Sequence, residues 1–101
     1  MKKLSGFQKK FLRGMAHHLE PIVMVGRNGV TKNVLKLADD ALKSHELIKV
    51  RFVELKDIKK NLTEEISSKT VSEIVGMIGH VAILYRQNPD KEKRKINIPL
   101  R

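Results

Sequence analysis

The chain has 101 residues, 41% of them apolar, which suffices for one domain with a single core. Its 21 Lys and Arg residues exceed the 11 Asp and Glu residues by ten charges, which favours a polyanionic partner. The absence of cysteine excludes disulfides, thiolate-ligated zinc and Cys nucleophiles, and it suits a reducing cytoplasm. The apolar runs are too short for a membrane helix, and no signal-peptide core follows Lys2 and Lys3. We therefore expect a soluble, cytoplasmic protein.

Positive charge gathers towards both ends of the sequence. Residues 1–19 carry five basic residues and no acidic one, and residues 74–101 carry six basic and two acidic residues. The stretch from Glu54 to Glu73 is mildly acidic. We expect that stretch to lie away from the anion that the rest of the surface meets.

The spacing of Ser5 and Gln8 is that of a capping box, and it predicts a first helix that runs to about Leu19. Apolar residues at helical spacing predict its buried stripe, which comprises Phe11, Leu12, Met15 and Leu19. Three basic residues fall largely off that stripe: Lys9, Lys10 and Arg13. One face of this helix is therefore expected in the core, and the other is basic.

Pro21 ends the helical pattern, and residues 22–25 are typical of a short buried strand. After a glycine-containing loop, Thr31 can cap a second helix that ends near Ser44 and His45. The buried stripe of that helix is predicted to be Val34, Leu35, Ala38, Ala41 and Leu42.

Residues 47–53 alternate in polarity and predict a strand whose wet face carries Lys49 and Arg51. Apolar residues four apart then predict a third helix from Asp57 to about Lys69. Residues 73–87 are interpreted as two strands, with Gly79 and His80 in the hairpin turn.

The end of the chain, from about residue 88, is predicted to be a basic tail, extended in part over residues 96–100. The whole order is helix, strand, helix, strand, helix, strand, strand. A crossover through a helix favours parallel pairing, whereas a hairpin is antiparallel. The sequence therefore predicts one α/β domain over residues 1–101, a two-layer fold with a mixed four-stranded sheet and three helices.

The G-x-x-G pattern from Gly26 to Gly29 leaves a predicted strand and opens a predicted helix. Backbone amides of such a loop and the helix N-terminus can point at a phosphate, and KH domains clamp single-stranded nucleic acid with a loop of this kind. Arg27 adds a bidentate phosphate donor, and Asn28 adds an amide. A plain structural turn explains the pattern equally well.

Two basic clusters are candidates for further phosphate contacts. Lys9, Lys10 and Arg13 share one sector of the first helix, and Lys49 and Arg51 share one strand face. Ordinary solvated surfaces are the alternative for both. Three of the four aromatic residues, Phe7, Phe11 and Phe52, are expected in the core, which disfavours a base-stacking platform.

Little in the sequence points to catalysis. The adjacent His17 and His18 would diverge by about 100° on a helix and could not share a metal ion. His45 and His80 fall in predicted turns, and the chain has no H-x-x-x-H, P-loop or nucleophile motif. We expect no enzyme activity, no catalytic residue, no cofactor and no metal.

Three segments together resemble a known family. They are LEPIVMVGRNGVTKNVL from Leu19, HELIKVRF from His45 and IGHVAILYR from Ile78. In order and spacing they are similar to the YhbY-type CRM domain, the chloroplast RNA splicing and ribosome maturation module. The resemblance covers about residues 3–99. It implies a fold similar to the C-terminal domain of translation initiation factor three.

Stand-alone bacterial members of this family are small RNA-binding proteins associated with precursors of the large ribosomal subunit. The resemblance therefore implies an RNA partner, with the contact at Gly26, Arg27, Asn28 and Gly29 and the basic first helix as a neighbouring surface. The full candidate surface adds Lys9, Lys10, Arg13, Lys32, Lys49, Arg51 and Arg86.

The leading hypothesis is thus an RNA-binding ribosome assembly factor without catalysis. A general nucleic-acid binder that uses the same loop, for DNA as well, is the alternative. An RNA-modifying enzyme comes third, since the sequence offers no residues for turnover.

Overall fold

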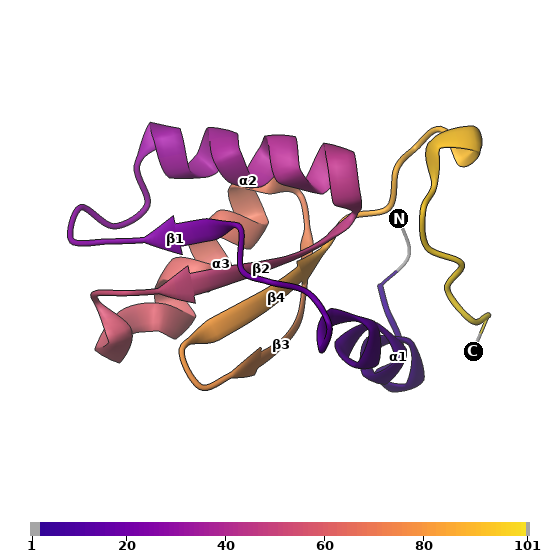
Figure 1. Ribbon diagram of the computed structural model, residues 1–101, viewed down its shortest axis with the longest axis horizontal. Coiled ribbons are helices and arrows are strands. Elements are labelled where there is room, and N and C mark those ends of the chain that lie inside the picture. The colour runs from indigo at the N-terminus through magenta and orange to yellow at the C-terminus, as the bar shows by residue number, and fades with distance from the viewer. Residues whose placement is uncertain (1–2, 101) are drawn as a thin grey trace.

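The computed structural model describes residues 3–100 and has the α/β fold that the sequence predicts (Figure 1). Over these residues the chain forms three α-helices: α1 (Gly6–Ala16), α2 (Lys32–His45) and α3 (Lys59–Thr70). The four strands are β1 (Val23–Val25), β2 (Leu47–Phe52), β3 (Glu73–Ile78) and β4 (Val81–Tyr85). Two short 3₁₀ turns, Lys56–Ile58 and Lys91–Lys93, complete the described elements.

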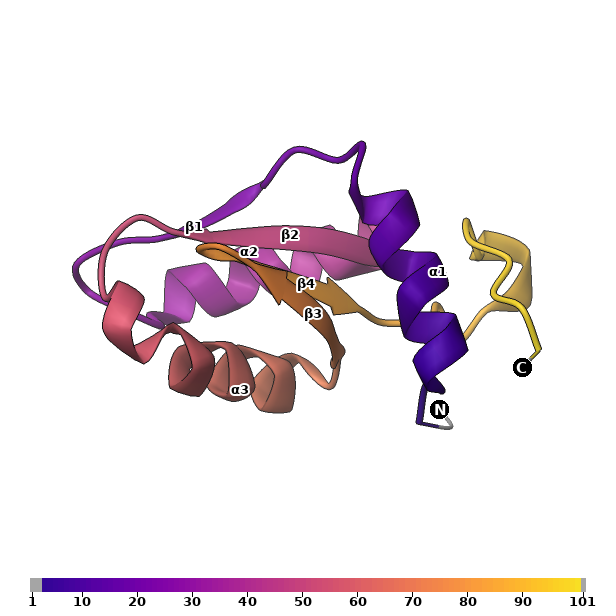
Figure 2. The ribbon, with the colours of Figure 1, turned by 90° about the horizontal axis from the view of Figure 1, so that it is seen from below.

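The sheet is mixed, as the connections require, with the spatial order β1-β2-β4-β3. β1 runs parallel to β2, and the other two pairs are antiparallel. Figures 1 and 2 show α2 and α3 side by side on one face of the sheet, while α1 lies across one end of the other face. The two-layer prediction therefore describes the α2 and α3 side, and α1 adds a partial third layer.

The predicted starts of α1 and α2 are confirmed by their caps. The Ser5 hydroxyl accepts the Gln8 backbone N–H at 3.1 Å, and the Gln8 side chain accepts the Ser5 N–H at 2.9 Å, which completes the capping box. The Thr31 hydroxyl accepts the Val34 N–H at 3.1 Å at the start of α2.

The main core lies between the sheet and the pair α2 and α3. The predicted stripe of α2 is confirmed, with Val34, Ala38 and Leu42 buried. These side chains meet the predicted inward residues of β2, namely Ile48, Val50 and Phe52. Alternation in β2 and helical spacing in α2 therefore identified the same interface from its two sides.

The predictions for α1 are wrong in three respects. The helix ends at Ala16 instead of Leu19, and Met15 and Leu19 are exposed in part instead of buried. Phe7, predicted in the core, is 48% exposed. The reason is geometric: Leu12 and Ala16 are fully buried, so the side of the helix opposite them, which carries Phe7, faces outward.

The face of β2 that is predicted to be solvent-exposed is exposed only in its second half, because α1 covers the first. Leu47 lies on the same strand face as Lys49 and Arg51, yet it is buried in a second cluster with Leu12, Ala16 and Tyr85. Lys49 is half-buried, and Arg51 at the uncovered end is exposed.

A glycine in β3 lets α1 approach the sheet. The Arg13 side chain crosses β3 and donates from Nη1 to the Val75 carbonyl at 3.0 Å. A Cβ at Gly76 would stand 2.8 Å from Arg13 Cδ, closer than the side chain tolerates. The strand register shifts between Ile74 and Gly76, as expected where a glycine interrupts a strand.

The buried carboxylate of Glu46 fixes the end of the chain. Glu46 links α2 to β2 with a positive φ of 65° and is 1% exposed. One carboxylate oxygen accepts the backbone N–H groups of Lys95 at 2.7 Å and Ile96 at 3.1 Å, and the other accepts that of Asn88 at 2.6 Å. The predicted tail therefore folds onto the body, and residues 96–100 form no strand.

Tyr85 lies beneath this segment. Its side chain is fully buried in the second cluster, together with Ile96. Burial of its hydroxyl group raises the pKa of Tyr85 to about 12, and the nearby Glu46 is a second, smaller cause.

Replacement of Glu46 by alanine should release residues 88–96 from the body. Three N–H donors, that of Ile96 buried and the other two partly buried, would lose their acceptor, so the free energy of unfolding should fall by roughly 2–4 kcal/mol. Urea unfolding measures this change, and hydrogen exchange should accelerate at the amides of Asn88, Lys95 and Ile96. Glu46→Gln keeps one acceptor oxygen and should lose less. Slow exchange at these amides in Glu46→Ala would contradict this role.

Candidate nucleic-acid interface

The predicted G-x-x-G loop is a tight turn between β1 and α2. The Gly29 N–H donates to the Gly26 carbonyl at 3.0 Å, and Gly29 has a φ of 71°, where a side chain is strained. Arg27 and Asn28 form the tip of the turn, and both are exposed. The turn thus presents one guanidinium and one amide outward on a fixed backbone.

The N-terminus of α2 follows this turn directly. Its first turn contains no acidic residue, and exposed Lys32 is its first residue. The first N–H groups of a helix carry a partial positive charge that attracts anions. Positive potential therefore gathers in one region from the N-terminus of α2, from Lys32 and from Arg27. A phosphate contact requires such a region.

A second basic region lies on the open part of the sheet. Arg13, His17 and Lys49 border a surface hollow of about 270 Å³ that is lined on its apolar side by Ile78, Val81 and Ile83. Lys49 Nζ donates to the Leu19 carbonyl at 3.0 Å. Arg51 lies two residues further along β2 and is exposed on the same face. We call Arg13, Lys49 and Arg51 the sheet-face cations.

The structure does not make α1 a neighbour of the glycine turn, so that expectation is wrong. β2 begins beside α1, where Leu47 pairs with Tyr85, and ends beside the turn, where Phe52 pairs with Val25. Figures 1 and 2 both show α1 and the turn at opposite ends of the molecule. Lys9 and Lys10 are therefore remote from Arg27, and the sheet-face cations lie between them.

Arg86 stands apart from the other candidates. Its Nη1 donates to Asp39 Oδ1 and to the Thr70 carbonyl, both at 2.7 Å, and its Nη2 donates to the Asp39 carbonyl at 3.1 Å. The hydrogen bond from Arg86 lowers the pKa of the Asp39 carboxyl. Arg86 thus joins α2 to the end of α3, on the face of the sheet opposite the sheet-face cations.

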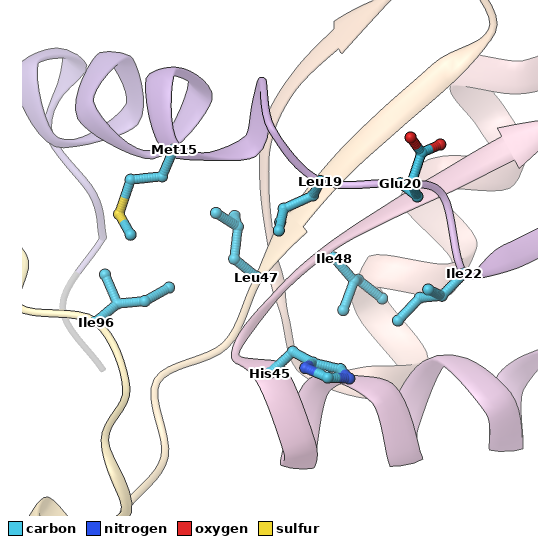
Figure 3. A pocket seen from close by; sticks show the side chains of 8 residues that line it. All are labelled: Met15, Leu19, Glu20, Ile22, His45, Leu47, Ile48 and Ile96. Atoms are coloured by element: carbon cyan, nitrogen blue, oxygen red, sulfur yellow. The ribbon is translucent and has the colours of Figure 1, made fainter.

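An apolar groove, which the sequence reasoning missed, opens between α1, the start of β1 and the end of the chain (Figure 3). It has a volume of about 310 Å³ and is lined by Met15, Leu19, Glu20, Ile22, His45, Leu47, Ile48 and Ile96. In Figure 3 the Glu20 carboxylate points away from the apolar side chains. The signal was present in the sequence, since Met15 and Leu19 belong to the apolar stripe that the helix leaves uncovered.

The histidines form no joint site. The rings of His17 and His18 meet edge to face with centroids 5.6 Å apart. His45 is the last residue of α2, and His80 lies in the hairpin turn, as predicted. Within residues 3–100, no group of three acidic or histidine side chains is placed to hold a metal ion. Over the same residues, each helix is too short or too polar to cross a bilayer.

The fold and this surface define a small α/β domain with a glycine turn at one end and cations along an open sheet face. The chain belongs to the CRS1 / YhbY (CRM) domain family, whose model matches residues 4–86. The predicted resemblance is thereby confirmed.

Relatives of similar length support this assignment. A Haemophilus influenzae protein named "RNA-binding protein" is 43% identical over 100 residues, which covers 98% of either chain. "Probable RNA-binding protein YqeI" of Bacillus subtilis is 39% identical over 97 residues, or 95% of this chain and 99% of the relative. The solution structure of the hypothetical protein SAV1595 from Staphylococcus aureus matches with a TM-score of 0.80 at 38% identity, covering 96% of this chain and all of that one.

Arg86→Ala should lower the stability of the fold. The substitution removes a guanidinium that satisfies Asp39 and the Thr70 carbonyl, so we expect a loss of about 2 kcal/mol in the free energy of unfolding. Urea denaturation measures this loss. Arg86→Lys keeps one donor group, so its stability should lie between those of the wild type and Arg86→Ala. Unchanged stability in Arg86→Ala would contradict this structural role.

Proposed function

We propose that this protein binds RNA and does so mainly through phosphate contacts. The observation that carries the proposal is the glycine turn, whose exposed Arg27 and Asn28 adjoin a helix N-terminus free of acidic residues. The net charge of +10 supplies the long-range attraction. The names of the Haemophilus and Bacillus relatives support RNA as the polyanion.

The sheet-face cations extend the proposed path of the RNA away from the turn. Arg51 is exposed, and the hydrogen bonds that Arg13 and Lys49 make to carbonyl groups hold both side chains in place. Side chains that are held before binding lose less conformational entropy when a phosphate arrives. Lys32 lies at the turn end of this path, and Lys9 and Lys10 lie at the α1 end.

The biological role that we propose is assistance in ribosome assembly, through association with the precursor of the large subunit. The family resemblance, to a module of RNA splicing and ribosome maturation, supports this role. Its mode of action would be binding without catalysis. A general nucleic-acid binder without ribosome specificity is the second candidate, favoured by the phosphate-directed character of the surface. Competition between structured RNA and duplex DNA at fixed salt separates the two.

Replacement of Arg27 and Asn28 together by alanine should weaken RNA binding without a change in the melting temperature. Both side chains are exposed at the tip of the turn, so their loss removes phosphate donors and leaves the core intact. Because Arg27 contributes one charge, the slope of log K against log salt should become shallower by about 1. Fluorescence anisotropy over a salt series measures both quantities.

Lys60→Ala serves as a matched control for charge, since Lys60 is exposed on α3, away from the proposed RNA path. Its effect on affinity should be much smaller than that of the double substitution. If the double variant binds RNA as tightly as the wild type, the glycine loop is a structural turn and not an RNA contact.

In cells, the protein should co-sediment with the large ribosomal subunit or its precursor instead of with translating ribosomes. A protein of this charge adheres to any ribosome at low salt, so the gradient is run at raised salt, where nonspecific attachment falls steeply. The wild type should stay with the precursor fraction, while the Arg27 and Asn28 double variant moves to the top. An even distribution of both proteins over all ribosomal fractions would favour the general binder.

A further inference from the structure

An aromatic side chain stands on the outer face of a basic helix. Phe7 is 48% exposed on α1, on the side opposite the fully buried Leu12 and Ala16. The helix contains Lys9, Lys10 and Arg13 and no acidic residue. Of these cations, Lys10 shares a surface hollow with Phe7. An exposed aromatic ring beside a cation is a combination that single-stranded nucleic-acid binders use, because the ring stacks on a base and the cation holds a phosphate.

A glycine two turns further along the same side of α1 has no packing role within the described chain. Gly14 lies in the interior of α1, where glycine destabilises a helix relative to alanine. A Cβ at Gly14 would meet no atom within 4 Å beyond its chain neighbours and the backbone of its own helix. Internal packing therefore does not require the glycine. The glycine leaves the helix backbone open to a flat ligand that approaches from outside.

Phe7 and Gly14 border the same hollow. A shallow depression of about 610 Å³ on the outer face of α1 is lined by Phe7, Lys10, Phe11, Gly14, Met15 and His18. Exposed Lys10 and His18 are among its lining residues, and Gly14 contributes no side chain to its surface. One surface thus combines an aromatic ring, a position without a side chain and the charge of Lys10.

We propose that this depression binds one unpaired RNA base, stacked on Phe7, with Lys10 and His18 towards the flanking phosphates. The inference rests on the proposed RNA binding and adds a site at the opposite end of the molecule from the glycine turn. Charge selects this occupant: a helix with three cations and no acid attracts a polyanion, and a base supplies the flat apolar face.

The test compares two RNA probes of equal length, a hairpin with an unpaired adenosine loop and a fully paired duplex. Phe7→Ala should weaken binding of the hairpin by about 5-fold or more, the usual range for loss of one stacked base. Binding of the duplex should stay unchanged. Phe7→Trp, which keeps an aromatic face, should retain hairpin affinity. Leu37→Ala is the matched control, because Leu37 is 47% exposed on α2, and neither affinity should change.

Gly14→Ala distinguishes binding from folding. Alanine should raise the melting temperature by about 2–8 °C, because it is the better helix former. The added methyl group on the floor of the depression should at the same time weaken hairpin binding. A glycine with a merely structural role would produce no such opposite effects.

Unchanged hairpin affinity in Phe7→Ala and Gly14→Ala overturns the proposal, as does an equal loss for hairpin and duplex in Phe7→Ala. In either case, wild-type binding of RNA leaves the proposed function standing. If the wild type binds neither probe while the fold is intact, the proposed function itself fails. The base-binding proposal is also overturned if the depression binds a protein and Phe7→Ala has no effect on RNA binding.

Discussion

A single buried carboxylate joins three parts of this chain. Glu46 follows the last residue of α2, precedes β2 and accepts hydrogen bonds from three backbone N–H groups within residues 88–96. A polar group removed from water is tolerated only where hydrogen bonds replace its hydration, and residues 88–96 supply them. The basic tail is thereby converted into part of the body. Ile96 then covers the second core cluster, in which Tyr85 and Leu47 are buried.

The position of α1 depends on that second cluster and decides how much of the sheet remains open. Leu12 and Ala16 pack against Leu47, Ile83 and Tyr85, so the helix covers the end where β2 begins. Arg13 ties it to β3 across Gly76. The uncovered remainder of the face carries Lys49 and Arg51, and it leads to the glycine turn. Packing at one end of the sheet thus leaves a basic surface at the other.

The sequence predicts the elements whose signals are local. The caps at Ser5 and Thr31, the alternation of β2 and the hairpin at Gly79 depend on neighbouring residues, and all are confirmed. The orientation of α1 depends on partners far along the chain. Apolar spacing alone predicts Phe11, Leu12, Met15 and Leu19 as the inner stripe. Contact with β2 and β4 buries Leu12 as predicted, adds Ala16 and leaves Met15 and Leu19 exposed in part. Phe7 is therefore exposed instead of buried.

The residues of the candidate site also fall into two groups, those with a local sequence signal and those that only long-range contacts reveal. Arg27, Asn28 and the two glycines are found by motif, because the turn is a short continuous segment. The engagement of Arg86 with Asp39 joins residues 47 positions apart, and only the folded chain reveals it. Glu46 gives no pattern, since its partners are backbone N–H groups that every residue type except proline supplies. The depression beside Phe7 becomes visible only once the inner side of α1 is known.

The separation of α1 from the glycine turn gives the molecule a fixed reach. The body measures 38 × 24 × 23 Å, and the sheet holds the two ends of its long axis apart. Two weak contacts on a stiff spacer reinforce each other only when the partner offers matching points at that span. A folded RNA holds such points in register, whereas a flexible strand must lose entropy to bring them there. Selectivity for the shape of a folded RNA would then come from the fixed distance between the two contact points. Base identity would not need to be recognised.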